Sequence, residues 1–154
     1  MVLAVADAYL HWVKTILMPI DYAMPADNTL RQARKMLNDR GENWKVLLLG
    51  TFRGPFTPIS QSVAIHDDLK RKTLEQLAIQ RDLLRDSGAA NGMTFELLAY
   101  MGSLENIVNY LSHEQKVDCL LLSTDLHANR EEFGKVLSRV RCPILVIPAI
   151  GKEV

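Results

Sequence analysis

Five short apolar segments constrain the fold more than any other feature of this sequence. They are 15–20, 45–52, 94–100, 119–123 and 144–148. Three of them are nearly continuous in apolar residues rather than alternating, which is typical of strands buried on both faces of a parallel sheet. The segment 94–100 is weaker and mixed, and this pattern favours a strand at an edge of the sheet.

Helical patterns fill the gaps between these segments. They cover 28–41, 63–88, 103–114 and 130–140. Gly41 and Gly88 are placed as C-terminal stops of the first two helices. Ser103 is placed to begin the third helix as an imperfect capping box, and Gly134 weakens the fourth.

Strands that alternate with helices predict an α/β fold with one five-stranded parallel sheet and helices on both faces, and we take the strand order to be 3-2-1-4-5. The chain has 154 residues, which suits a single domain over 14–150. We expect 1–13 to form a helix or arm packed on that domain, or to be the junction where the domain was cut from a larger chain. The Gly/Pro-rich loop 53–60 follows the second strand, on the side where such sheets bind ligands.

The charge balance and the cysteines narrow the class of protein. Lys+Arg and Asp+Glu number 18 each, so nothing in the net charge predicts a nucleic-acid partner. The apolar start of the chain is too short to span a bilayer, and we expect no membrane insertion. Cys119 and Cys142 lie in or beside apolar segments and form no CxxC pair, which indicates reduced thiols in a cytoplasmic protein.

A candidate site lies where the order of the strands reverses, between the first and the fourth. The carboxyl ends of these two strands carry Asp21 and the run Ser123, Thr124 and Asp125, which we expect to converge. Asp21 is suited to accept a hydrogen bond from a ribose hydroxyl or a base edge, or else to cap a turn or the next helix. Ser123 and Thr124 have hydroxyls for a phosphate, or simply end the strand.

The segment after the fourth strand is poorly suited to a phosphate. Phosphate sites use backbone N–H groups, glycines and positive charge. Asp125, Glu131 and Glu132 are acidic, and only Arg130 or a metal would compensate for them. Gly134 is the one glycine near this segment that could contribute to a phosphate site.

Catalytic and metal-binding patterns are not found in the sequence. The histidines are His11, His66, His113 and His127. None has the spacing of a metal motif, and neither cysteine has the sequence context of a nucleophile. We therefore predict no metal, no catalytic residues and no enzyme activity.

Three stretches carry a resemblance to a known family. "KTILMPID" at 14–21, "MGSLENIVNYLSHEQKVDCLLLST" at 101–124 and "VLSRVRCPILVIP" at 136–148 resemble elements of the universal stress proteins, and the likeness covers roughly 14–149. The resemblance implies a five-stranded parallel sheet and a homodimer through the last strand, at 143–148. In one branch of the family it also implies binding of ATP or another adenine nucleotide.

In that branch the nucleotide site uses the aspartate that ends the first strand, Asp21 here, and a glycine after the third strand, where Gly102 stands. The phosphate-binding part departs from the family pattern. Leu126 and the pair Arg130-Glu131 occupy positions of glycines or of a Gly-Ser pair, and Ser123 replaces the glycine that ends the fourth strand in many members. A side chain at such positions fills the space that phosphates need.

Two principal hypotheses follow. The first is a regulatory or signalling module, without catalysis, that acts by dimerisation and by binding an unknown protein partner. The alternative is a sensor of AMP, ATP or another small adenine ligand that uses Asp21 and Gly102. A slow ATPase is the third and weakest hypothesis.

Overall fold

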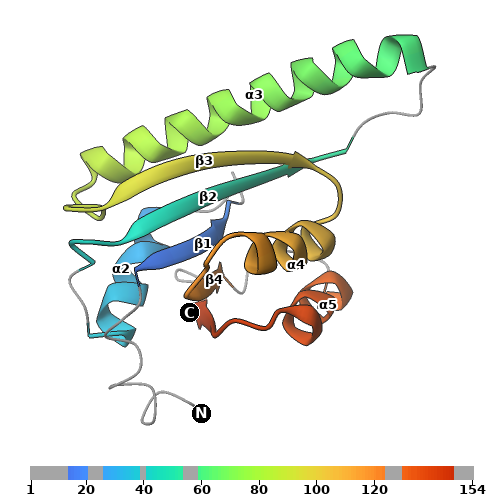
Figure 1. The fold of residues 1–154 in the computed structure, drawn as a ribbon. Coiled ribbons are helices and arrows are strands. Elements are labelled where there is room, and N and C mark those ends of the chain that lie inside the picture. Colours follow the sequence, from blue (N-terminus) through green and yellow to red (C-terminus); the bar gives the residue numbers. More distant parts are fainter. Residues whose placement is uncertain (1–13, 21–25, 39–40, 54–58, 124–129, 148–154) are drawn as a thin grey trace.

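The computed structural model describes residues 14–20, 26–38, 41–53, 59–123 and 130–147. Its strands are β1 (Thr15–Pro19), β2 (Lys45–Phe52), β3 (Thr94–Met101), β4 (Cys119–Ser123) and β5 (Ile144–Ile147). Its helices are α2 (Ala26–Met36), α3 (Ile59–Asp86), α4 (Leu104–Glu114) and α5 (Arg130–Arg139). Each strand after the first is preceded by a helix, as Figure 1 shows along the chain.

The sheet confirms the predicted topology. Its five strands run in the order β3-β2-β1-β4-β5, and every adjacent pair is parallel. The longest pairing joins β2 to β3, from Lys45 opposite Thr94 to Phe52 opposite Met101. The mixed segment 94–100 forms the edge strand β3, as its pattern indicated.

Helices cover both faces of the sheet and create two hydrophobic clusters. On one face, α2 and α3 pack against the sheet through residues such as Leu30 and Leu77, both fully buried. On the other face, α4 and α5 pack through residues such as Val108 and Val136. None of the helices that the structure describes is both long enough and apolar enough to cross a membrane.

Two boundaries differ from the sequence prediction. Helix α2 ends at Met36, and Asn38 takes the left-handed conformation with φ of 49°, whereas Gly41 lies in the turn before β2. Asparagine tolerates this conformation better than most residues, so the helix ends about one turn earlier than predicted. Helix α3 begins at Ile59, so the predicted loop 53–60 is shorter than expected. The expected N-terminal arm, 1–13, lies outside the described residues.

Helix α3 is longer than the strands beneath it. It has 28 residues and therefore spans about 42 Å. The strands β2 and β3 have 8 residues each and span about 26 Å. The N-terminal part of α3 consequently extends past the ends of these strands, as Figure 1 shows at the upper right.

The core contact of α3 can be tested by truncation. Leu77 is fully buried, whereas Leu137 on α5 is 39% exposed. We expect Leu77→Ala to lower the free energy of unfolding by about 2–5 kcal/mol, since it leaves a cavity, and Leu137→Ala to lower it by less than about 1 kcal/mol. Urea unfolding followed by circular dichroism measures both; equal losses would contradict the packing described.

Candidate functional site

The order of the strands reverses between β1 and β4. These strands are neighbours in the sheet, with Ile16 opposite Cys119 and Leu17 opposite Leu120. The chain runs from β1 toward β2 and β3 on one side and then returns to β4 and β5 on the other. Ligands of open α/β sheets bind at the carboxyl ends of the two strands at such a reversal. The structure therefore has the framework of the predicted crevice.

Ser123 lies at the carboxyl end of β4, beside this reversal of strand order. It is the last residue of β4, it is 7% exposed, and it is paired with Ile147 of β5. Continuing the register of β1 and β4 by three residues places Ser123 beside Ile20. Asp21 and Thr124, the other two residues predicted at these strand ends, lie outside the described residues, as does Asp125.

Gly102 ends β3 at the same edge of the sheet, but far from Ser123. Two strands stand between β3 and β4, so the two residues are separated by three strand spacings, about 14 Å. The Gly102 N–H donates to the carbonyl oxygen of Phe52 at 2.9 Å. A ligand that touched both Gly102 and Ser123 would have to lie across the ends of β2 and β1.

The backbone of Gly102 explains why a glycine stands there. Its φ is 139°, in the region that residues with a side chain rarely adopt. A Cβ at this position would lie 3.3 Å from Cδ1 of Ile107. The glycine thus allows the chain to turn sharply from β3 into α4, and this structural role holds whether or not a ligand binds.

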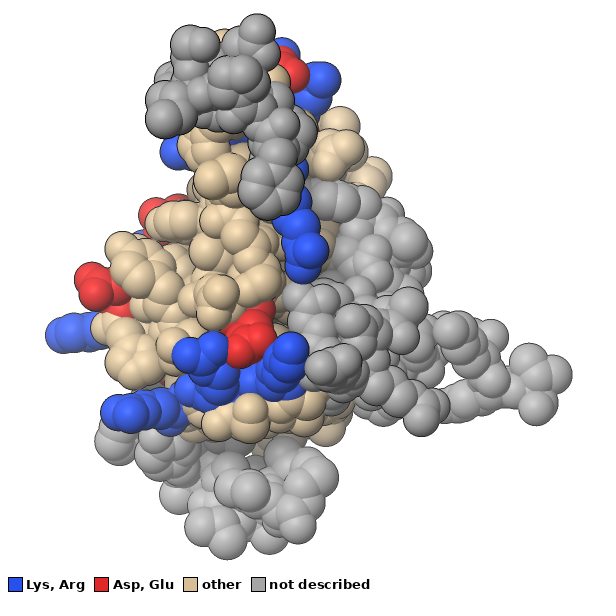
Figure 2. Space-filling view, turned by 90° about the vertical axis from the view of Figure 1, so that its right-hand side faces the viewer, with Lys and Arg blue, Asp and Glu red and all other residues tan. Residues whose placement is uncertain are grey.

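Polar contacts already occupy the start of α4. The Ser103 hydroxyl accepts a hydrogen bond from the Asn106 N–H at 3.3 Å, which confirms Ser103 as the cap of this helix. Glu105 accepts a hydrogen bond from Arg139 of α5. Figure 2 shows basic side chains on either side of a small acidic patch on this face of the molecule. The ion pair between Glu105 and Arg139 was not predicted, since 34 residues separate its members and no local spacing signals it.

Gly134 does not belong to a loop between β4 and α5. It lies inside α5, which begins at Arg130, and a Cβ added to it would meet nothing within 4 Å. Its neighbours therefore do not require a glycine. The side chains of Glu131 and Glu132 are not among those described.

The environment of both cysteine thiols favours their protonated form near neutral pH. Burial raises the pKa of the Cys119 thiol to about 12, and burial also raises the pKa of Cys142. A thiol must lose its proton to attack or to bind a metal. Across the described ranges, no three His, Cys, Asp or Glu side chains gather in a way that could hold a metal ion.

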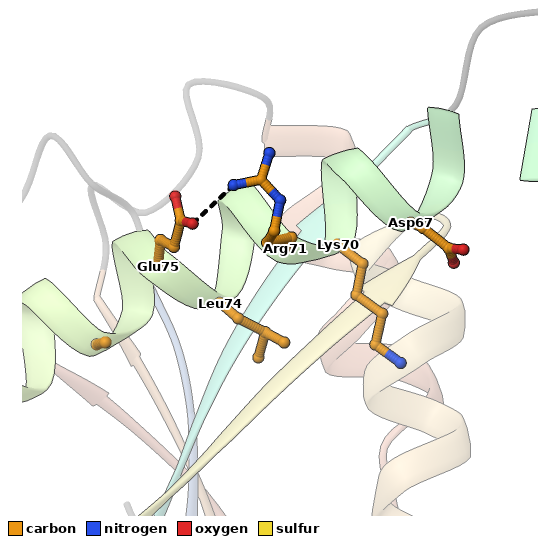
Figure 3. Close-up of a pocket in the computed structure, with 6 residues that line it drawn as sticks. Asp67, Lys70, Arg71, Leu74 and Glu75 are labelled. Atoms are coloured by element: carbon orange, nitrogen blue, oxygen red, sulfur yellow. Dashed lines mark hydrogen bonds and ion pairs between the residues drawn. The ribbon is translucent and has the colours of Figure 1, made fainter. Parts of the chain in front are cut away.

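A shallow hollow of about 400 Å³ lies along α3, away from the crevice. Its described lining comes from one helix face and consists of Asp67, Lys70, Arg71, Leu74, Glu75 and Ala78. In Figure 3 Lys70 and Leu74 point toward the strands, while Arg71 and Glu75 form an ion pair of 2.8 Å. The polar groups described in this hollow thus come from one helix and are partly used in ion pairs, whereas binding sites usually have convergent groups from several elements.

Comparison by structure gives a consistent result. The chain is similar to a universal stress protein from Lactobacillus plantarum, with a TM-score of 0.62 and 15% identity over 88% of this chain and 97% of that one. It is similar to a universal stress protein in complex with cAMP, with a TM-score of 0.57 and 16% identity over 89% and 98% of the two chains. The chain has the universal stress protein fold. An Arabidopsis thaliana universal stress protein family protein with AMP bound has a TM-score of 0.57 and 14% identity over 91% and 94% of the two chains.

Comparisons by sequence, with models of protein families and with curated proteins, give no match. At identities of 14–16%, the shared feature is the fold of the universal stress proteins. The predicted resemblance is therefore confirmed at the level of the fold. The roles of individual site residues remain predictions.

Two glycines provide a matched test of these local interpretations. We expect Gly102→Ala to destabilise the protein by about 1–3 kcal/mol, because the alanine is strained at this φ. We expect Gly134→Ala to stabilise it by about 0.5–1 kcal/mol, because alanine is the better helix former and the site is open. Chemical denaturation measures both; a neutral Gly102→Ala would contradict the strained turn.

Proposed function

We propose that this protein is a regulatory or signalling module that acts by dimerisation and by binding a protein partner, without catalysis. The observation that carries the proposal is the chemistry of the segment between β4 and α5. That segment, 124–129, reads "TDLHAN" and contains no glycine. Phosphate sites need closely approaching backbone N–H groups and favour positive charge, and this segment offers an aspartate instead.

The position of Gly134 supports the proposal. If Gly134 replaced the missing glycines, it would be expected in the loop before α5. It is instead a helical residue with open space around it. We infer that the chain has lost the phosphate-binding part of the nucleotide site, and that a triphosphate is not its ligand.

The absence of catalysis is also a proposal. The raised pKa values of Cys119 and Cys142 keep both thiols protonated near neutral pH, so they support no covalent chemistry. Reduced, unpaired thiols are typical of the cytoplasm, which is where we propose that the protein acts. The protein partner is defined only by its class.

The homodimer is proposed to form through β5 and its flanks, 143–148. This strand is at one edge of the sheet and is paired on one side by β4. Edge strands have free backbone N–H and C=O groups on their outer side, and pairing with another chain satisfies them. Ile144 and Val146 are each only partly buried within one chain, which leaves apolar surface for a partner.

A sensor of adenine ligands is the second candidate. Three solved structures with this fold contain cAMP, AMP or dAMP. Ser123 and Gly102 lie along the edge where such a ligand would lie, and Asp21 and Thr124 are proposed to complete the site. A ligand without a triphosphate would not need phosphate contacts from the segment 124–129, which contains no glycine.

Thermal unfolding with ATP, ADP, AMP, adenosine and cAMP, each with and without Mg²⁺, separates these candidates. A ligand present at about a hundred times its Kd stabilises a protein by roughly 2.7 kcal/mol, which raises the Tm by several degrees. We expect no rise in Tm with ATP. A rise with AMP or adenosine that Asp21→Ala abolishes would establish the sensor, and a rise with ATP would refute the lost phosphate site.

The proposed dimer is tested at Val146. We expect Val146→Lys to convert dimers into monomers or to give insoluble protein, since the lysine places a charge in an apolar strand interface. Leu137→Lys, on the exposed side of α5, is the control and should keep the wild-type mass. Light scattering after size exclusion measures the mass; an unchanged dimer in Val146→Lys would refute this interface.

A further inference from the structure

The strands of the sheet are not all joined over the same length. Strand β1 pairs with β2 at five positions, and β4 pairs with β5 at four. Among the described residues, β1 and β4 pair at two positions, with Ile16 opposite Cys119 and Leu17 opposite Leu120. The sheet thus consists of two well-paired parts, β3-β2-β1 and β4-β5, which meet along a short ladder (Figure 1).

A proline explains why this ladder is short. The Thr15 N–H is directed toward the segment before β4, where it donates to Asp118. Alternate residues of a strand face the same neighbour, so Leu17 and Pro19 also face β4. Proline has no N–H to donate, and the ladder ends at Leu17. The two strands are therefore joined near their amino ends, whereas the crevice is expected at their carboxyl ends.

Asp118 strengthens the amino end of this ladder. One oxygen of its carboxylate, Oδ2, accepts hydrogen bonds from the N–H groups of Lys14 and Thr15, each at 2.9 Å. Its own N–H donates to the carbonyl oxygen of Thr15 at 2.9 Å. Hydrogen bonds to a carboxylate are stronger than those between neutral groups. Three hydrogen bonds thus tie the residue that precedes β4 to the start of β1.

The position of Asp118 is itself fixed by its two neighbours in the sequence. Val117 is 9% exposed and packs into the cluster beneath α4 and α5. Cys119 is 2% exposed and packs into the cluster beneath α2 and α3. Because the chain is buried on both sides of Asp118, this residue cannot follow β1 if β1 moves away from β4.

The apolar pattern of β1 does not specify its register. Ile16 and Met18 pack into the cluster on one face, and Leu17 packs into the cluster on the other. A shift of register by one residue exchanges the two faces of a strand. In β1 this exchange replaces one apolar side chain by another, whereas it would remove the N–H groups of residues 14 and 15 from the Asp118 carboxylate.

We propose that Asp118 is a positioning residue for the candidate site. It holds β1 against β4 at the closed end of the crevice and so sets the separation of their carboxyl ends, where Asp21 and Ser123 are expected to contact a ligand. The nature of that ligand rests on the second candidate function, a sensor of adenine ligands. A binding site loses its geometry when its groups move by about 1 Å, and one residue of a strand spans about 3.3 Å.

Amide hydrogen exchange measured by NMR tests this role. The N–H of Leu17 faces β4, whereas the N–H of Ile20 donates to the carbonyl oxygen of Leu49 on β2 at 2.9 Å. We expect Asp118→Ala to accelerate exchange of the Leu17 amide at least about tenfold more than exchange of the Ile20 amide, because β1 opens from β4 and not from β2. Equal acceleration of both amides, or none, would overturn the proposal.

Three further variants separate positioning from a general loss of stability. Asp118→Asn keeps an oxygen that accepts both N–H groups, so we expect it to restore slow exchange of the Leu17 amide. Val108→Ala leaves a cavity in the cluster beneath α4 and α5, and it should accelerate the Leu17 and Ile20 amides equally. Asp118→Ser, which keeps a shorter acceptor, provides the same comparison if the alanine variant does not fold. An Asp118→Asn protein that exchanges like the alanine variant would contradict the role of the acceptor oxygen.

The exchange measurement requires neither a ligand nor a protein partner, so its result is distinct from a test of the proposed function. Equal exchange of the two amides in Asp118→Ala would refute the positioning role and leave both candidate functions to their own experiments. A protein whose Tm does not rise with AMP or adenosine would lose the sensor as a candidate. The selective opening of β1 from β4 would still be expected in that protein.

Discussion

The burial of β1 on both of its faces is the constraint on which the rest of the structure depends. Leu17 packs into the cluster beneath α4 and α5, while Ile16 and Met18 pack into the cluster beneath α2 and α3. The same strand pairs with β2 on one side and β4 on the other. A strand that is enclosed in this way needs a continuous apolar sequence and a partner on each edge. The reversal of strand order lies between β1 and β4, and ligands of open α/β sheets bind at such a reversal.

Much of the fold could be predicted because the apolar segments indicate directly which parts of the chain are buried. The apolar segments of β1, β2 and β4 became central strands, and the mixed segment 94–100 became the edge strand β3, since an edge strand is only partly covered. The segment 144–148 is continuously apolar as well, yet it forms the other edge strand, β5. Helix ends were harder to predict, because the sequence contains competing stop signals. Helix α2 ended before Asn38, which has a φ of 49°, and not at Gly41. A buried strand is predicted from a pattern of many residues, so one atypical residue does not change the prediction. A helix end depends on one or two residues and is therefore predicted less accurately.

The site was less accessible to prediction than the fold. Strand order and strand ends are enough to place Ser123 and Gly102 at one edge of the sheet, but their separation across two strands follows only from the topology. The contact between Glu105 and Arg139 joins α4 to α5, and its members are far apart in the sequence. Gly134 lies inside α5, as predicted, at an open position where its neighbours do not require a glycine. Residue type suggests a chemistry, but position in the fold decides whether that chemistry can be used.

Many polar side chains on the surface of this molecule already make contacts within the chain. At the start of α4, Ser103 caps the helix and Glu105 is paired with Arg139, so these side chains stabilise the fold. Along α3, Arg71 likewise forms ion pairs with Asp68 and Glu75. Ile79 and Leu83 of α3 are exposed apolar side chains, and exposing them to water costs free energy. The polar groups described at both places therefore stabilise the fold through contacts within the chain.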